Sequence, residues 1–143
     1  MKQASVSIKN PCRSIHDMSN MSGLCQTLSH FSLRRMPRSE RELENLVSEW
    51  LAREGYVMKR QKSSRVGHLD LAVSLDEGNV VLELKRVATM ACFPQLDRYS
   101  QVCSGLVMVC WRATAPFKRV FKMTKTQIPV ALFELEKKAP MIS

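Results

Sequence analysis

The feature that most constrains this chain is a pair of alternating segments joined by a short polar turn. Residues 69–73 (LDLAV) and 80–85 (VVLELK) alternate between apolar and polar side chains, and residues 76–79 (DEGN) separate them. Alternation of this kind is typical of half-buried strands, and Asp, Gly and Asn favour tight turns. The pattern therefore predicts an antiparallel hairpin with one apolar face.

The predicted hairpin places two carboxylates opposite each other. A turn over residues 75–78 sets a register in which Asp70 pairs with Glu83, with Cβ atoms about 4.5–5.5 Å apart. Alternation puts Lys85 on the same face, with His68 across from it, while a slip of one residue would break this arrangement. We expect the opposite face to hold Leu69, Leu71, Val80, Leu82 and Leu84.

Opposed carboxylates need compensation, because two half-buried acids cannot both ionise side by side. Lys85 is one candidate, and a hard divalent cation, which prefers carboxylate oxygens, is the other. Together a cation and an ammonium group can bind phosphate and stabilise the charge that develops during its hydrolysis. The alternative interpretation is a solvated face on which the acids and Lys85 pair without further function.

An amphipathic helix precedes the hairpin and supplies a third acid. Ser39 and Glu42 form a capping-box pattern, and Gly55 is a typical helix terminator. Glu44 lies at the margin of the apolar stripe and can face the sheet, with Glu40 as the fallback for this position. The stripe itself consists of Leu43, Leu46, Val47, Trp50 and Leu51.

The remaining segments complete a helix and strand order of α-β-β-β-α-β-α-β. They are a strand at 56–61, a basic turn at 62–65, a helix at 95–103, a strand at 106–111, a basic helix at 116–125 and a strand at 130–134. This order predicts an α/β fold with a mixed β-sheet flanked by helices. We expect one domain over residues 39–135 and a short C-terminal tail over 136–143.

Residues 1–38 show no hydrophobic periodicity, and we expect them to be a disordered, basic N-terminal segment. They contain seven serines, six basic residues and one acid, Asp17. A Ser-rich, acid-poor composition also resembles an organellar transit peptide, and Met36 is an alternative start. Regular structure is expected to begin after Pro37.

Composition excludes several classes of protein. No apolar run among the 143 residues approaches the about 18 that a membrane span needs. The five cysteines include no C-x-x-C pair, which argues against a zinc site or a disulfide framework and for a reducing, cytoplasmic location. An organellar location is the alternative if residues 1–38 are a transit peptide. The net charge of +9 favours a polyanionic partner.

These motifs together resemble the PD-(D/E)XK nuclease superfamily, which has the restriction endonuclease-like fold. The matching residues are Glu44, Gly67-His68-Leu69-Asp70 and Val81-Leu82-Glu83-Leu84-Lys85, with Leu69 where the motif usually has proline. With residues 80–86 and 95–99 (QLDRY) included, the chain resembles the catalytic domain of EndoMS/NucS endonucleases. The stretch 44–60 is also similar to archaeal Holliday-junction resolvases. The resemblance covers about residues 39–135.

The resemblance implies a set of site residues. Asp70, Glu83 and the Leu84 carbonyl would ligate Mg²⁺ or Mn²⁺. Lys85 would orient or help deprotonate the attacking water and contact the scissile phosphate. Glu44 would hold the metal or a water bound to it, and Gln95 would support the site from the second helix. The mismatch endonucleases also carry a separate N-terminal DNA-binding and dimerisation domain. Only 38 residues precede the nuclease-like region here, so mismatch specificity is not carried over.

Basic residues near the predicted site are candidates for DNA contact. They are Lys59, Arg60, Lys62, Arg65 and Arg86. A second basic stripe consists of Lys118, Arg119, Lys122 and Lys125. Such clusters suit phosphate contacts, which position DNA without reading its sequence. The alternative is a solvated basic face.

Three hypotheses follow for function. The first is a metal-dependent DNA endonuclease in repair, recombination or restriction, which could act as a homodimer to cut both strands. The second is a non-catalytic nucleic-acid-binding module on the same fold. The third is a small interaction protein whose basic charge is incidental.

Overall fold

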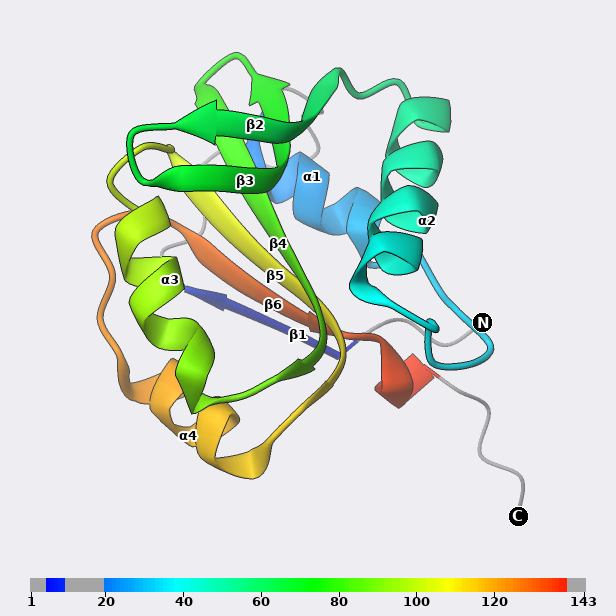
Figure 1. The fold of residues 1–143 in the computed structure, drawn as a ribbon, viewed down its shortest axis with the longest axis vertical. Coiled ribbons are helices and arrows are strands. Elements are labelled where there is room, and N and C mark those ends of the chain that lie inside the picture. Colours follow the sequence, from blue (N-terminus) through cyan, green and yellow to red (C-terminus); the bar gives the residue numbers. More distant parts are fainter. Residues whose placement is uncertain (1–4, 10–19, 139–143) are drawn as a thin grey trace.

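The computed structural model describes residues 5–9 and 20–138 (Figure 1). Its elements are β1 (Ser5–Lys9), α1 (Met21–Leu28), α2 (Glu40–Arg53), β2 (Met58–Ser64), β3 (Gly67–Leu75), β4 (Gly78–Ala88), a 3₁₀ turn (Met90–Cys92), α3 (Phe93–Tyr99), β5 (Gly105–Ala113), α4 (Ala115–Met123), β6 (Val130–Glu134) and a second 3₁₀ turn (Leu135–Lys138). From α2 to β6, the order of helices and strands is the predicted one.

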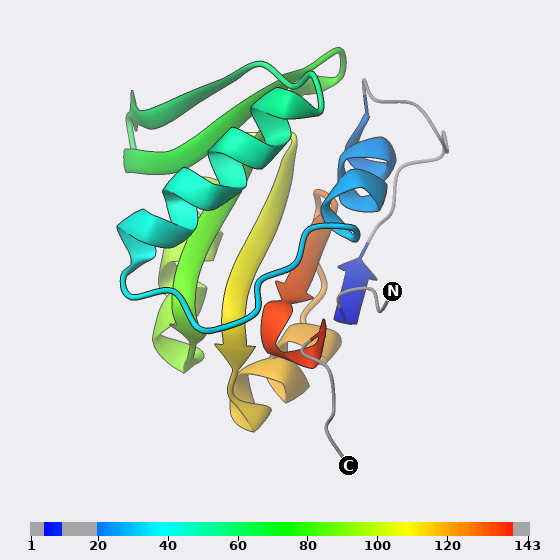
Figure 2. The same cartoon turned by 90° about the vertical axis from the view of Figure 1, so that its right-hand side faces the viewer.

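The six strands form one mixed sheet in the order β1-β6-β5-β4-β3-β2. Strands β4, β5 and β6 run parallel, whereas β2, β3 and β4 are antiparallel neighbours and β1 pairs antiparallel to β6. Helices α1 and α2 lie on one side of the sheet, and α3 and α4 on the other (Figures 1 and 2). The predicted α/β class with a mixed, helix-flanked sheet is confirmed.

Each face of the sheet buries its own apolar cluster. The cluster under α1 and α2 includes Leu24, Leu43, Val47, Leu51, Leu71, Leu82, Leu84, Val107 and Phe133. The cluster under α3 and α4 includes Leu69, Val81, Leu96, Tyr99, Met108, Phe117, Phe121 and Leu132. Strand β4 lies inside the sheet and contributes residues to both clusters. Both of its faces are therefore covered, and a polar side chain on either face is buried.

Helix α2 begins and ends as the sequence predicts. The backbone N–H of Glu42 donates to Ser39 Oγ at 3.0 Å, which satisfies one of the free donors of the first turn. Gly55 follows the helix with φ of +94°, a conformation that glycine adopts without a steric penalty. The helix therefore presents a defined face, with Glu44 on it, to the sheet.

The predicted hairpin register is confirmed from Leu71–Leu82 to Leu75–Gly78, but the ladder ends there. The expected Asp70–Glu83 pair falls just beyond its end. The prediction that Leu69 shares a face with Leu71 is wrong, because Leu69 packs into the cluster under α3 and α4. N-terminal to Leu71, β3 is no longer paired with β4, so β4 does not determine which way the side chains of this part of β3 point.

The expectation of disorder over residues 1–38 is wrong for the described part of that segment. Helix α1 is capped by Asn20, which accepts from Gly23 N–H at 2.9 Å, and β1 pairs with β6 at the edge of the sheet. The helix buries Met21, Leu24, Cys25 and Leu28 in the core. This spacing is a helical stripe, and burying it stabilises the segment. Residues 1–4 and 10–19 lie outside the described residues.

Several boundaries also differ from prediction. The helix expected at 95–103 is α3, which ends at Tyr99, and the basic helix expected at 116–125 is α4, which ends at Met123. The basic turn expected at 62–65 is mostly strand, because β2 continues to Ser64 and the chain turns at Arg65 and Val66. The predicted C-terminal tail begins with a 3₁₀ turn, and residues 139–143 lie outside the described residues. Within the described ranges, no helix has the length and apolar character needed to cross a membrane.

Candidate active site

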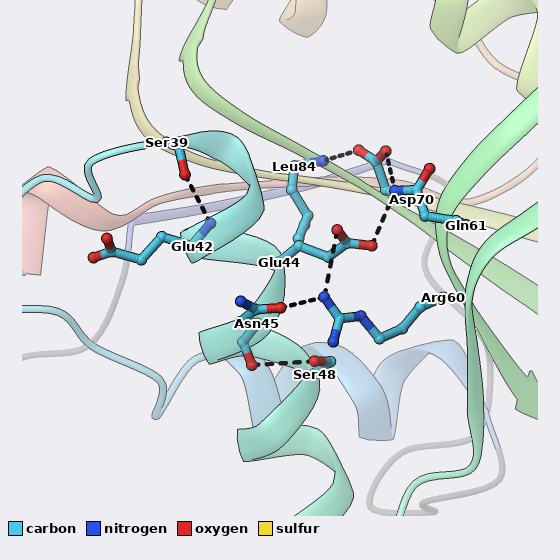
Figure 3. Close-up of polar contacts among 9 residues, drawn as sticks. All are labelled: Ser39, Glu42, Glu44, Asn45, Ser48, Arg60, Gln61, Asp70 and Leu84. Atoms are coloured by element: carbon cyan, nitrogen blue, oxygen red, sulfur yellow. Dashed lines mark hydrogen bonds and ion pairs between the residues drawn. The ribbon is translucent and has the colours of Figure 1, made fainter.

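The candidate site lies where β3 separates from β4. Asp70 Oδ2 accepts from the backbone N–H of Leu84 at 3.1 Å, so a carboxylate takes the place of a ladder hydrogen bond (Figure 3). Hydrogen-bonding positions recur at every second residue from the turn-closing Leu75–Gly78 pair. The N–H and carbonyl of Leu84 therefore both face β3, and the divergence leaves room beside them.

Glu83 follows Leu82, the last residue of β4 that pairs with β3, and is only 1% exposed. Its Oε1 atom lies 3.6 Å from Lys85 Nζ, while Oε2 has no hydrogen-bond partner. Burial raises the pKa of Glu83 to about 8, and the nearby Asp70 carboxylate adds to this rise, whereas Lys85 opposes it. The site thus contains a buried carboxyl group with unused acceptor capacity.

Lys85 is half-buried between two acids. Its ammonium lies 3.6 Å from Glu83 Oε1 and 3.8 Å from Glu40 Oε1. Burial alone would lower the pKa of Lys85, but the charges of Glu83 and then Glu40 outweigh burial and raise it above its ordinary value. The lysine is therefore a positively charged donor at neutral pH.

Glu44 is buried on α2 and faces β2 (Figure 3). Its Oε1 atom accepts from Gln61 Nε2 at 3.1 Å, and its Oε2 atom lies 3.6 Å from Arg60. The guanidinium of Arg60 also donates to Asn45 Oδ1. Glu44, the predicted third acid, thus lies beside the site, and its two carboxylate oxygens contact two residues of β2.

Gln61 was not identified from the sequence. Its amide nitrogen lies between Glu44 Oε1 and Asp70 Oδ1, at 3.1 and 3.5 Å (Figure 3). Burial raises the pKa of Asp70, as does the charge of Glu44, while the Leu84 N–H, Lys85 and the Gln61 amide oppose the rise. The signal that could have identified Gln61 is the β2–β3 register. Placing the turn at Arg65 and Val66 sets this register and puts Gln61 opposite Asp70.

A cleft of about 580 Å³ opens beside these residues, between α2 and β2. It is lined by Glu40, Arg41, Glu44, Asn45, Arg60, Gln61 and Asp70. Its lining combines acids that can bind a cation with guanidinium groups that can contact phosphate. A phosphate-bearing ligand can therefore approach Asp70 from this side.

Gln95 reaches the site indirectly. Its side-chain amide donates to the Tyr99 hydroxyl at 2.7 Å, and that hydroxyl donates to the His68 carbonyl at 3.1 Å. Tyr99 is buried, so the chain of hydrogen bonds ties α3 to the end of β3 that leads into Asp70. The described contacts link Gln95 through Tyr99 to His68, two residues before Asp70, and the His68 side chain is exposed.

The predicted DNA-contact residues are in different environments. Lys59 is exposed on β2, Arg60 pairs with Glu44, and the side chain of Lys62 lies outside the described residues. Arg65 donates to the Gln101 carbonyl at 2.8 Å, and Arg86 donates to the Pro37 carbonyl at 2.9 Å. Arg86 therefore fastens the segment before α2 to the sheet, and its role in DNA contact stays a prediction.

The donor set can be tested for its fit to a divalent cation. In the described part of the chain, no three or more His, Cys, Asp or Glu side chains come close enough to hold a metal. The predicted ligands are instead two carboxylates and the Leu84 carbonyl, with waters completing the shell as Mg²⁺ commonly requires. The unpartnered Glu83 Oε2 fits this role, because a cation would satisfy it.

Comparisons with known proteins show the fold. No protein-family profile and no curated protein matches the chain. The crystal structure of a repair endonuclease from Pyrococcus abyssi superposes with a TM-score of 0.53 at 22% sequence identity, over 72% of this chain and 49% of that one. The chain therefore shares its fold with about half of a repair endonuclease.

Proposed function

We propose that this protein is a divalent-metal-dependent deoxyribonuclease of the PD-(D/E)XK type, which hydrolyses phosphodiester bonds by water attack. The observation that carries the proposal is Glu83, a buried carboxyl group with one unpartnered oxygen beside a charged lysine. In folded proteins, buried carboxylate oxygens that have only a structural role almost always have a hydrogen-bond partner. A carboxylate that binds a cation needs an oxygen that is free to bind it.

In this proposal Asp70, Glu83 and the Leu84 carbonyl hold Mg²⁺ or Mn²⁺. The ion would polarise a phosphoryl oxygen and lower the pKa of a water. Asp70 is already oriented for this task, because the Leu84 N–H fixes one of its oxygens. The orientation comes from the backbone of β4 and therefore requires no rearrangement of the sheet.

Lys85 would act as a hydrogen-bond donor. Its raised pKa keeps it protonated, which favours orienting the water and stabilising charge on the scissile phosphate over deprotonating the water. Glu44 would position a water at the edge of the site. Gln95 would support β3 through Tyr99.

DNA is the proposed partner, with a role in DNA repair as the first candidate. The similar structure from Pyrococcus abyssi is that of a repair endonuclease, which supports this choice, as does the net charge of +9. Homodimerisation would supply a second site for the other strand.

The test is cleavage of a panel of labelled DNAs that includes duplex, mismatch, junction, flap and single-stranded substrates. Wild type and Asp70→Ala would be assayed with Mg²⁺, Mn²⁺ or EDTA, with Asp97→Ala as a matched exposed-acid control on α3. We expect metal-dependent cleavage by wild type and by the control, and none by Asp70→Ala. Salt-sensitive DNA binding without cleavage would instead favour a non-catalytic binding module.

A further inference from the structure

Gln61 links two acids that come from different elements. Its Nε2 atom lies 3.1 Å from Glu44 Oε1 on α2 and 3.5 Å from Asp70 Oδ1 on β3. An amide nitrogen has two hydrogens, so it can donate to both carboxylates at once. Figure 3 shows the amide between the two acids.

The backbone at Gln61 is unusual. Its φ of +50° makes it the single non-glycine residue with positive φ in the described ranges. The β2–β3 register is the same on either side, with Arg60 opposite Leu71 and Lys62 opposite Leu69, so Gln61 faces Asp70 across the ladder. Such outliers persist where the surrounding structure enforces them, and they cluster at functional sites.

The amide suits the space between the acids better than the other polar side chains of similar length. It donates hydrogen bonds without carrying charge, whereas a lysine or arginine would repel a cation at Asp70 and a glutamate would repel both carboxylates. The second oxygen of Asp70 already accepts from Leu84 N–H. With Gln61, both Asp70 oxygens have a donor, and the plane of the carboxylate is fixed.

We propose that Gln61 is a positioning residue, which orients the Asp70 carboxylate for a divalent cation and couples it to Glu44. This inference rests on the proposed function and adds a residue to its site. The left-handed backbone at Gln61 directs the amide to both acids. Glycine at this position would relieve the backbone strain and remove the amide together, whereas glutamate would keep the strain and remove only the donor, so the two variants compared separate the two contributions.

The experiment compares wild type with Gln61→Gly and Gln61→Glu, with Gln127→Gly as an exposed control away from the site. Binding of Mn²⁺ is measured by electron paramagnetic resonance of the free ion, and kcat and KM are measured on the preferred DNA. Thermal unfolding without metal reports the fold. For Gln61→Gly we expect a 10–100-fold loss of Mn²⁺ affinity with an unchanged or higher melting temperature.

Gln61→Glu keeps the length of the side chain and removes the donor. We expect its kcat to fall at least 10-fold while its KM for DNA stays within threefold, because the site and not the DNA surface changes. The control should match wild type in every measurement. A fall in the melting temperature of both variants with Mn²⁺ affinity unchanged would overturn the proposal, since that is the pattern of a purely structural residue.

The outcomes separate this inference from the proposed function. If wild type binds Mn²⁺ and cleaves DNA while both variants stay within twofold of it, Gln61 has no positioning role and the nuclease assignment stands. If wild type neither binds Mn²⁺ nor cleaves DNA, the nuclease assignment fails and the role of Gln61 fails with it. Loss of cooperative unfolding in both variants would also overturn it.

Discussion

Two buried glutamates on the same sheet have opposite surroundings. Glu134 on β6 is 3% exposed. Its Oε2 atom accepts from the Ala113 N–H at 2.7 Å, and its Oε1 atom lies 3.3 Å from Lys118 Nζ. Glu83 on β4 is 1% exposed, yet one of its oxygens has no partner and the other lies 3.6 Å from Lys85. Both acids have a lysine nearby, but only Glu134 has a hydrogen-bond partner for each oxygen.

Whether the hydrogen bonds of a buried carboxylate are satisfied distinguishes a structural acid from a candidate functional one. Burial of a carboxylate is tolerated when its hydrogen bonds are made, as at Glu134, where the acid links β5, α4 and β6. At Glu83 the cost of burial is not offset within the protein. An external cation that completes the site would offset it, which is why the proposed metal site includes Glu83 and not Glu134.

The largest expected effect is on cleavage. Glu83→Gln removes a charge that the proposed metal site requires, so we expect DNA cleavage to fall at least about 1,000-fold, or about 4 kcal/mol of transition-state stabilisation. Glu134→Gln, the matched variant, should retain activity within about threefold if it folds. Initial rates with Mg²⁺ on one labelled substrate measure both, and equal losses in the two variants would remove the distinction.

The next-largest effect is on the free energy of unfolding, where substitution of Glu134 should cost more than substitution of Glu83. Glu134→Ala leaves the Ala113 N–H buried without an acceptor and Lys118 without its partner, so we expect a loss of about 2–4 kcal/mol in the free energy of unfolding. Glu83→Ala should cost less, since it removes an acid with one unpartnered oxygen and no backbone hydrogen bond among the described contacts. Urea unfolding with EDTA present checks the order, and the reverse ranking would contradict this account.

A third prediction concerns pH. The pKa of Glu83 is raised from 4.5 to about 8 in the folded protein, so the folded state keeps a proton that the unfolded state has lost. Between about pH 4.5 and 8, metal-free stability should therefore fall as pH rises, by at most about 1.4 kcal/mol per unit from this group. Glu83→Gln should reduce that slope, whereas Glu134→Gln should preserve it. Unfolding across this pH range is the measurement.

The smallest effect separates the two lysines. Lys118→Met leaves one oxygen of buried Glu134 without its donor and should cost about 1 kcal/mol, because the ammonium is partly exposed and its contribution is screened. Lys85→Met should change metal-free stability by less than about 0.5 kcal/mol, since Glu83 is mostly protonated at neutral pH, yet it should reduce cleavage. Parallel melting and cleavage assays would test this, and a larger stability loss at Lys85 would argue for a structural ion pair.

The hairpin and the helix before it could be predicted from the sequence because their determinants are local. The turn sequence fixes the register of β3 and β4 as far as Leu71, and Ser39 and Gly55 define the ends of α2. Asp70, Glu83, Leu84 and Lys85 were therefore identified and do lie together. Their assignment as metal ligands and catalytic groups stays a prediction.

What could not be predicted depends on contacts between distant segments. The divergence of β3 from β4, which moves Leu69 to the other core and turns Asp70 onto Leu84, is not encoded in alternation alone. Gln61 has positive φ, and no residue-type pattern marks it. Helix α1 is a different case, because Met21, Leu24, Cys25 and Leu28 do form a stripe, which the serine-rich surroundings obscured.

Calorimetric titration of Mn²⁺ into wild type, Glu83→Gln and Glu134→Gln at pH 7, in two buffers with different ionisation enthalpies, tests directly whether Glu83 binds the metal. Because the pKa of Glu83 is about 8, wild type and Glu134→Gln should bind the ion and release nearly one proton. Glu83→Gln should bind weakly and release none. Equal binding and proton release by all three proteins, or no binding by wild type, would contradict the account.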